Sequence, residues 1–334
     1  IENWDEKIIA DYTLLKHLKM NTYAYGNQNE NLSIIYLRGE NGGTILNRNG
    51  KLRKLNLQGK GMALPGIYYS FNPSGRYLTY STNTMVRDFN INADKRLEVY
   101  DTASDIYVAD LDNNRIISSP QESDSSHLET FPTFSANGKY IYYCAANKKE
   151  LSDKDLKNLK NLKNLKYALV RIPFNEENGT FGERIDTLYS SRSVSHPKIS
   201  PDGRFCLFTA LDYGTYPAWH TEADLYMLDL QTGKTDSLNI VNSEKSDTYH
   251  CWSHTGKWFV FISKRDDGIY GKPYFCYIDR QGKAHKPFVL PQKDPTFYDD
   301  CLKSFNIPEL SRGPVPFNTI GIEQALKQEA EQFR

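Results

Sequence analysis

The chain has no excess charge of either sign and no long hydrophobic run. Its 41 basic and 41 acidic side chains give a formal net charge of zero, so it has no overall attraction to nucleic acid or to an anionic membrane. No apolar run reaches the roughly 18 residues that a membrane-spanning helix requires. We therefore expect no nucleic-acid partner and no transmembrane segment.

Catalytic signatures are also missing. The sequence contains no G-x-S-x-G, no H-E-x-x-H, no P-loop and no G-x-G-x-x-G, which are the short motifs that position nucleophiles, zinc ions and nucleotide phosphates. We predict no catalytic residue, and we favour a non-enzymatic protein over an enzyme.

Cysteine is scarce and unpaired in its spacing. None of the five cysteines stands in a C-x-x-C pair, which argues against a zinc knuckle or a thioredoxin-type site. Most lie inside strand-like runs, where small buried thiols are expected. The chain begins at Ile1 without a methionine or a signal peptide, so we expect a mature or trimmed piece of a longer protein.

Aromatic residues, in contrast, are abundant. They make up 13% of the 334 residues, and they favour strands. The length suits one large repeat fold or two ordinary domains. This composition favours an all-β chain.

One pattern occurs four times: a short apolar strand, a polar turn ending in glycine, a basic residue and an aromatic-rich strand. The turn glycines are Gly75, Gly138, Gly203 and Gly256, which are 63, 65 and 53 residues apart. Glycine fits there because tight turns between strands often need a positive φ. The four copies are Phe71–Tyr77, Phe134–Tyr140, Ile199–Phe205 and Trp252–Trp258.

Further strands follow each turn, as in Asp105–Asp110 and Asp224–Asp229. Together with the turns they give five strand clusters between residues 32 and 293. About 50 residues and four strands per cluster is typical of a β-propeller blade. The sequence predicts an all-β propeller of five or six four-stranded blades with short helical termini.

The domain boundaries follow from this repeat. Residues 1–31 are predicted to be a helical or extended segment that packs on the ring, 32–293 the propeller, and 294–334 a strap and closing helix. The closing helix would turn Ile322, Ala325, Leu326 and Phe333 towards one face. A Lys- and Leu-rich insert at 148–166 interrupts the third cluster, either as a basic arm that contacts a partner or a membrane or, as we favour, as a solvated loop.

Propeller sites usually lie where the innermost strands begin, at the mouth of the central channel. Counting seven residues back from each turn glycine gives Tyr68, Phe131, His196 and Tyr249, and six back gives Tyr69, Pro132, Pro197 and His250. These residues are expected to ring one mouth. They could hold a ligand or partner, or pack as rim aromatics, or contribute to a metal site with Cys251 or His220. We predict no metal, because a metal needs three or more converging ligands.

Two loops supply further candidates. Trp219 and His220 lie in an aromatic-rich loop, where exposed rings suit a sugar or a protein partner but can equally cap a blade. Residues 265–268 read Arg-Asp-Asp-Gly. This tight turn has too few oxygen ligands for a calcium site, and we expect an internal Arg–Asp ion pair.

The glycine turn followed by a basic residue and an aromatic, together with the D-L-Y-x-x-D-L-x-T-G run at 224–233, resembles the TolB-like β-propeller repeats. Four other segments are similar to a group of Bacteroidetes envelope propellers labelled cytochrome c-like. These segments are Gly43–Arg48, Trp219–Tyr226, Arg265–Gly268 and Lys303–Glu309.

The chain departs from that group at one motif. Members carry a C-x-x-C-H haem-attachment motif just upstream of the first blade, and the aligned stretch here is Lys19–Tyr23, without thiols or histidine. A thioether link and a proximal ligand are both missing, so we expect no covalent haem and no other cofactor.

The resemblance implies an exported protein of the periplasm or outer membrane that offers one ring face to a partner protein, and we expect it to be a monomer. The alternative is a carbohydrate-binding protein or a metal-dependent enzyme with a site at the channel mouth. Fold analogy alone supports either function.

Overall fold

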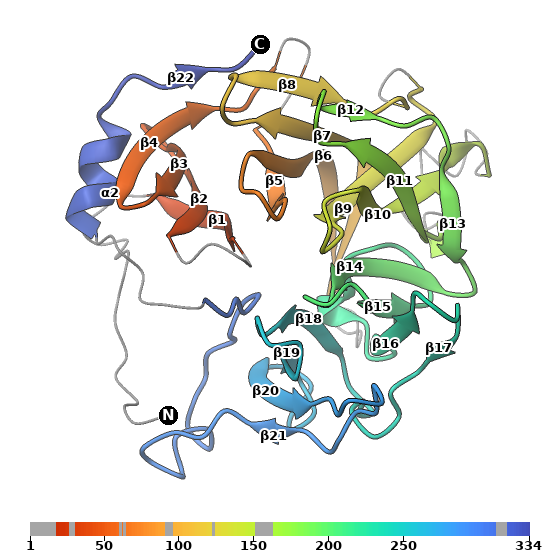
Figure 1. Cartoon of the computed structure of the whole chain (residues 1–334). Helices are drawn as coiled ribbons and strands as arrows, with labels where there is room; N and C mark the ends of the chain where they lie inside the picture. Colours follow the sequence, from red (N-terminus) through yellow and green to blue (C-terminus); the bar gives the residue numbers. More distant parts are fainter. Residues whose placement is uncertain are drawn as a thin grey trace.

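A computed structural model describes residues 18–26, 31–59, 62, 65–90, 96–121, 124–150, 163–311 and 319–334. Within them the strands group into five blades around a central channel (Figure 1). This arrangement confirms the predicted all-β propeller. No helix in these ranges is long and apolar enough to cross a membrane.

Each blade is an antiparallel sheet whose first strand lies innermost (Figure 1). Blade 1 contains β1 (Lys19–Tyr25), β2 (Leu32–Arg38), β3 (Gly43–Arg48) and β4 (Lys51–Asn56). Blade 2 contains β5 (Ile67–Phe71), β6 (Tyr77–Phe89), β7 (Leu97–Asp110) and β8 (Arg115–Ser118). Blade 3 contains β9 (His127–Phe134), β10 (Tyr140–Asn147) and β11 (Ala168–Asn175), with the short β12 (Thr180–Phe181) and β13 (Asp186–Tyr189) both on β11.

The last two blades are simpler. Blade 4 contains β14 (Ser193–Ile199), β15 (Phe205–Leu211), β16 (Asp224–Asp229) and β17 (Thr235–Asp236). Blade 5 contains β18 (Asp247–Trp252), β19 (Trp258–Ser263), β20 (Lys272–Tyr277) and β21 (Phe288–Val289). Every residue of β15 is buried, as expected for a strand covered on both faces by neighbouring blades.

The four predicted glycine turns have the expected backbone. Gly75, Gly138, Gly203 and Gly256 all have φ between 66° and 74°, the left-handed region that favours glycine. In blades 2 and 4 the basic residue that follows is an arginine, and it reaches the aspartate at the end of the third strand of its own blade. Arg76 Nη2 lies 2.7 Å from Asp110 Oδ2, and the equivalent pair in blade 4 joins Arg204 to Asp229. In these two blades the repeat therefore encodes an ion pair within the blade as well as a turn.

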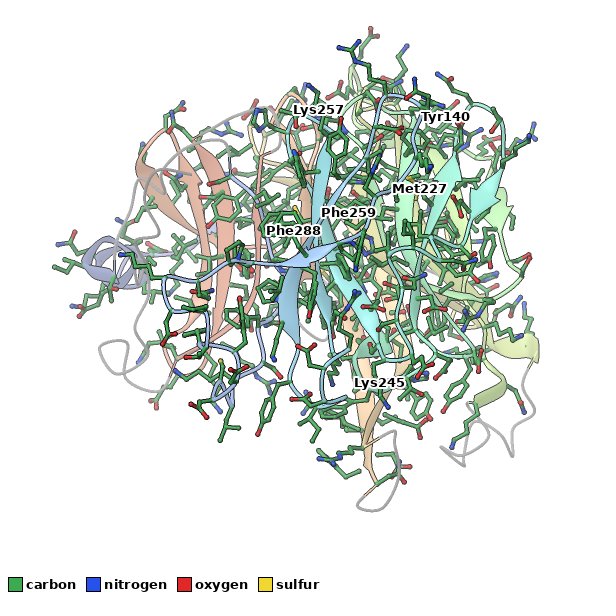
Figure 2. All side chains as sticks on the ribbon, turned by 90° about the horizontal axis from the view of Figure 1, so that it is seen from below. Tyr140, Met227, Lys245, Lys257, Phe259 and Phe288 are labelled. Atoms are coloured by element: carbon green, nitrogen blue, oxygen red, sulfur yellow. The ribbon has the colours of Figure 1, made fainter. Side chains whose placement is uncertain are left out.

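The propeller has two distinct faces. The glycine turns, including Lys257, lie at one end of the channel, which we call the turn face. The loops that precede each innermost strand, including Lys245, lie at the other end, the mouth face (Figure 2). The hairpin of β6 and β7 is longer than those of the other blades and projects on the same side as Lys245 (Figure 2).

The N-terminal boundary differs from the prediction. Residues 1–31 were placed outside the ring, but β1 is the innermost strand of blade 1 and pairs with β2 from Lys19 to Tyr25. Its sequence carries no glycine turn, so the repeat pattern could not reveal it. Residues 1–17, where the predicted helix begins, lie outside the described ranges. So does most of the 148–166 insert, although Leu165 is buried in the core between blades.

The C-terminal prediction is partly wrong. A single helix was expected through residue 334, but α2 ends early and spans only Thr319–Leu326. After it, β22 (Glu331–Gln332) pairs in parallel with β4. Ile322, Ala325 and Leu326 pack on blade 1, whereas Phe333 enters a different core, between blades 1 and 2.

Candidate binding site at the channel mouth

Four innermost strands carry a bulge at the same place. The register shifts between Ile67 and Ser70 in β5, and equivalent shifts occur in β9, β14 and β18. At each bulge one bulky residue has a positive φ: 58° at Tyr68, 53° at Phe131, 50° at His196 and 52° at Tyr249. Such a conformation is costly for these residue types, and bulges re-aim side chains. These are the residues seven positions before the turn glycines.

The bulges bring the four rings together inside the channel. The Phe131 ring centroid lies 4.1 Å from that of Tyr68 and 3.8 Å from that of His196, and Tyr249 follows at 5.0 Å from His196. We call Tyr68, Phe131, His196 and Tyr249 the aromatic quartet. The rings therefore contact one another in a row and narrow the channel at this level.

The buried carboxylate of Asp101 contacts the quartet indirectly, through Tyr216. The Tyr216 ring lies 5.8 Å from that of Phe131, and its hydroxyl donates to Asp101 Oδ1 over 2.9 Å. Asn83 Nδ2 donates to the same oxygen over 3.0 Å. Burial raises the pKa of Asp101 to about 7, although these hydrogen bonds oppose the shift. Sequence reasoning missed Asp101, because its position in β7 has no equivalent charged residue in the other blades.

His196 is held in one tautomer. Ser195 Oγ donates to the carbonyl oxygen of Thr215 over 2.6 Å, so the contact of 2.5 Å between Ser195 Oγ and His196 Nδ1 requires Nδ1 to carry the proton. Nε2 is then a lone-pair acceptor, and it is buried without a hydrogen-bond partner in the protein. Burial holds the pKa of His196 well below its usual value, so the ring is neutral.

The other predicted histidines point elsewhere. His250 Nε2 donates to the carbonyl oxygen of Leu207 over 2.9 Å, and burial lowers the pKa of His250 to about 3. His220 Nδ1 lies 2.9 Å from Glu222 Oε1. Across the described ranges, no three His, Cys, Asp or Glu side chains are placed to hold a metal ion. The histidines therefore do not converge on one pocket.

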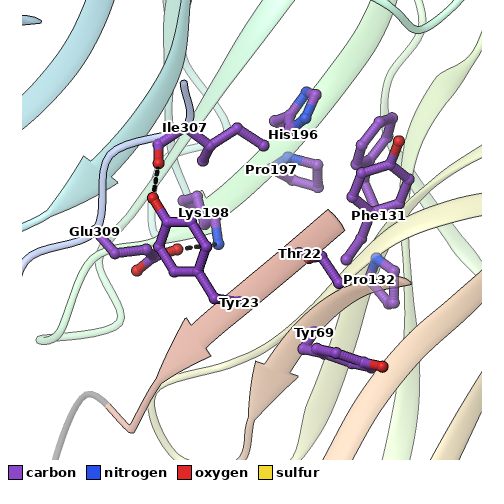
Figure 3. A pocket seen from close by; sticks show the side chains of 11 residues that line it. Thr22, Tyr23, Tyr69, Phe131, Pro132, His196, Pro197, Lys198, Ile307 and Glu309 are labelled. Carbon is purple, nitrogen blue, oxygen red and sulfur yellow. Dashed lines mark hydrogen bonds and ion pairs between the residues drawn. The ribbon is translucent and has the colours of Figure 1, made fainter. Parts of the chain in front are cut away.

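A small chamber, lined in part by Tyr68, Phe131 and His196, lies next to the quartet (Figure 3). Its volume is about 40 Å³, and Tyr69, Pro132 and Pro197, the residues six positions before the turn glycines, lie in its wall. A second space of about 30 Å³ continues towards the glycine turns. Both are large enough for a few water molecules only.

The C-terminal strap reaches into this chamber between blades 5 and 1. The Tyr23 hydroxyl donates to the carbonyl oxygen of Ile307. Glu309 Oε1 lies 3.6 Å from Lys198 Nζ (Figure 3). The Cys251 thiol donates to Glu309 Oε2 over 3.4 Å. Strap residues thus link β1 of blade 1 to β14 and β18, which no strand pairing among the described residues does.

Replacing Glu309 by alanine is expected to lower the free energy of unfolding by about 2 kcal/mol, because it leaves the Lys198 ammonium half-buried without its carboxylate. The double variant Glu309→Ala/Lys198→Met should recover much of that loss. Urea unfolding measures both. Asp112→Ala, which removes the exposed partner of Arg48, is the control and should cost less than about 1 kcal/mol. A double variant no more stable than the single one would contradict the role given to this pair.

An open cleft lies beside the quartet on the mouth face. Its volume is about 320 Å³. Tyr249 of the quartet and Trp219, from the 3-10 turn η3 (Pro217–Trp219), line it together with Ser246, Lys264, Phe305 and Asn306. We call it the Lys264 cleft. The Lys264 ammonium nitrogen lies 3.2 Å from the Trp219 ring centroid.

Of the eight predicted site residues, Tyr68, Tyr69, Phe131 and His196 line the channel chamber, and Tyr249 and Trp219 line the cleft. His250 and His220 line neither space. The predicted ion pair within residues 265–267 is absent. Arg265 pairs instead with Asp247, at 3.0 Å, because the turn aims its guanidinium back at β18. Sequence reasoning also missed Lys264, although it directly precedes that turn.

Comparisons with known proteins bear on the fold. No protein-family model matches the sequence, and no curated protein is similar to it. Among solved structures, an oligogalacturonate lyase in complex with manganese matches with a TM-score of 0.50 and 11% identity over 82% of this chain and 73% of that one. A TolB protein from Agrobacterium tumefaciens matches with a TM-score of 0.48 and 14% identity over 81% of this chain and 80% of that one.

A prolyl endopeptidase also matches, with a TM-score of 0.48 and 11% identity over 83% of this chain and 37% of that one. Likeness at such identities concerns fold and leaves function open. The chain is a β-propeller that resembles, at low sequence identity, the propellers of TolB and of prolyl peptidases.

Proposed function

We propose that the protein is a non-enzymatic propeller of the bacterial cell envelope that binds a partner protein through its mouth face. One observation carries this proposal. The aromatic quartet and the strap leave only small spaces in the channel, whereas the mouth face holds the Lys264 cleft, which is open and of a size typical of ligand sites. A larger cleft of about 610 Å³ lies at the glycine turn of blade 3, but the exposed hairpin of β6 and β7 lies on the mouth face.

The long hairpin adds an apolar contact on this face. Phe89, at the end of β6, is 71% exposed, and an aromatic side chain at that level of exposure is a common anchor in protein interfaces. The hairpin stands beyond the rim that the other blades form (Figure 2). A partner that contacts both the cleft and the hairpin would bury a continuous part of the mouth face.

The alternatives receive less support. A metal-dependent enzyme would need ligands that converge, and His196, His220 and His250 do not. A glycan would stack on an aromatic ring face, and the Lys264 ammonium occupies one face of Trp219. The envelope location rests on the sequence resemblance.

Photo-crosslinking in the native cells tests the proposal. A benzophenone amino acid at Phe89 or Lys245 should give the same protein adduct, whereas one at Lys257 on the turn face should give none. The adduct protein, once purified, should bind the wild-type propeller and bind Phe89→Ala at least about tenfold more weakly. Adducts only from Lys257, or none from any position, would contradict the proposed face. Cell fractionation should place the protein in the envelope.

A further inference from the structure

We propose that the Lys264 cleft binds a carboxylate that is attached to a flat apolar group, with the Lys264 ammonium as the residue that binds the anion. This proposal concerns the mouth face named above but does not require the partner protein to exist. It is argued from the pairing of charges in blade 5, the walls of the cleft and its size.

Lys264 is the unpaired member of a group of three basic residues. Arg265 is 3.0 Å from Asp247, and Lys272 Nζ is 2.9 Å from Asp266 Oδ2. Lys264 is only 9% exposed, yet within the described ranges its ammonium has no carboxylate at ion-pair distance. Buried ammonium groups normally have a counter-charge. A ligand carboxylate would complete the pairing that the two neighbouring cations already have.

The charges around Lys264 do not neutralise its ammonium group. Burial lowers the pKa of Lys264 to about 8, Asp267 opposes the shift and the nearby Arg96 adds to it. Asp267 Oδ1 is itself engaged, because it accepts hydrogen bonds from the amides of Ile269 and Tyr270 over 2.7 and 2.8 Å. The cation–π contact with Trp219 offsets only part of the cost of burial. The site therefore attracts an anion.

Several other polar groups of the cleft already have partners in the protein. Ser246 Oγ donates to the carbonyl oxygen of Pro217, Ser304 Oγ accepts from the amide of Gly271, and Asn306 Oδ1 accepts from the amide of Ile307. The remaining walls include the apolar side chains of Ile262 and Phe305 and the ring of Tyr249. One ammonium among apolar walls suits a ligand with a single anionic group and a flat apolar body.

Size limits the ligand further. At about 320 Å³, the cleft is at the small end of the range for ligand pockets. It suits a small aromatic acid or the C-terminal residue of a polypeptide, and both present the same chemistry. A phenyl ring carrying one carboxylate is the simplest probe that has it.

Calorimetric titration of the whole chain with phenylacetate is the test, with phenylacetamide as the uncharged probe of the same shape. Phenylacetate should bind at least about tenfold more tightly than the amide. Lys264→Met should remove that difference, and Lys272→Met, which alters a paired lysine, should keep it. Binding should weaken above about pH 8, where the free ammonium loses its proton, rather than near the pKa of an ordinary lysine.

The source of the carboxylate is tested with the peptide acetyl-Gly-Gly-Phe, carrying a free or an amidated C-terminus. If the free-acid peptide and phenylacetate each bind in separate titrations, the natural ligand is a polypeptide C-terminus. If only phenylacetate binds, the natural ligand is a small acid. Equal binding of phenylacetate and its amide to the wild-type protein, or no binding of either, overturns the proposal even if a variant fails to fold. Crosslinking at Phe89 could still succeed, so the two proposals fail separately.

Discussion

Replacing Asp101 by asparagine is expected to stabilise the protein by about 4 kcal/mol at pH 8 and to have almost no effect at pH 4. Burial raises the pKa of Asp101 to about 7 in the folded protein, whereas the unfolded chain has the ordinary value near 4. Below pH 4 both states are protonated, and the carboxyl group costs nothing. Between pH 4 and 7 only the unfolded state ionises, so stability falls as pH rises, and above pH 7 the loss is constant.

Asparagine removes this penalty and keeps an oxygen for the Tyr216 hydroxyl and for Asn83 Nδ2. Urea unfolding from pH 4 to 8 is the measurement. The advantage of the variant should grow by about 1.4 kcal/mol per pH unit across the window. If the free energies of unfolding of variant and wild type changed in parallel with pH, the pKa of Asp101 in the folded protein would be the ordinary one. In that case the carboxylate must have a cation near it that the folded structure does not show.

Glu129 should affect stability over the same pH range as Asp101. It is 1% exposed, and burial raises its pKa to about 7 as well, so it adds a second loss of stability as pH rises. Asp110 has the opposite effect. Its hydrogen bonds from Arg76 and Asn113 outweigh burial and lower its pKa to about 2, so its contribution is present above pH 4 and is lost as pH falls towards 2. His196 and His250 are neutral when buried, so below about pH 6.5 they lower stability as pH falls and offset the slope from Asp101 and Glu129. Wild-type stability should therefore be nearly level between about pH 4.5 and 6.5 and fall on either side of that range.

The position of Asp101 gives this penalty a functional meaning. Its carboxylate fixes Tyr216 against Phe131, and four residues nearby hold positive φ values. Local strain and a destabilised carboxyl group in the same place indicate a part of the fold selected for more than stability. The Asp101→Asn variant separates these effects, because it should gain stability whether or not partner binding changes.

The sequence predicts the repeated part of the fold. Each glycine turn follows from local chemistry, namely a positive φ at glycine, a polar residue before it and a basic residue after it. The aromatic quartet could be located by counting from those turns, because the bulge occupies the same place in each innermost strand. What counting could not show is that the rings contact one another, since that depends on how far each bulge turns its side chain.

The rest of the site depends on contacts between distant segments. Glu309 lies 58 residues after Cys251 in the chain and meets it in the channel. Lys264 becomes unusual only because Asp247, Asp266 and Asp267 all have other partners. No local pattern encodes either fact. Sequence analysis alone therefore finds the channel mouth but not the residue that gives its cleft a charge.

Phe333→Ala is expected to lower the free energy of unfolding by about 3 to 5 kcal/mol, as for other buried phenylalanines. Phe333 is 5% exposed and packs in the core that includes Leu55 and Tyr107, between blades 1 and 2. The next residue pairs through its backbone with β8: Arg334 accepts from the amide of Ile116 over 2.8 Å. The C-terminus therefore connects the outer parts of blades 1 and 2. The cavity left by alanine would weaken the packing between them.

Ile320→Ala, on the exposed side of α2 (64% exposed), is the matched control and should change stability by less than about 0.5 kcal/mol. Hydrogen exchange should show which strands lose stability in Phe333→Ala. The amides of β3, β4 and β8 should exchange faster, while those of β15 and β19 should not, because blades 4 and 5 pack in cores that do not include Phe333. The Lys264 cleft lies on blades 4 and 5, so its affinity for phenylacetate should be unchanged. A uniform rise in exchange would mean that the five blades unfold as one unit, and that the tail closes the whole ring.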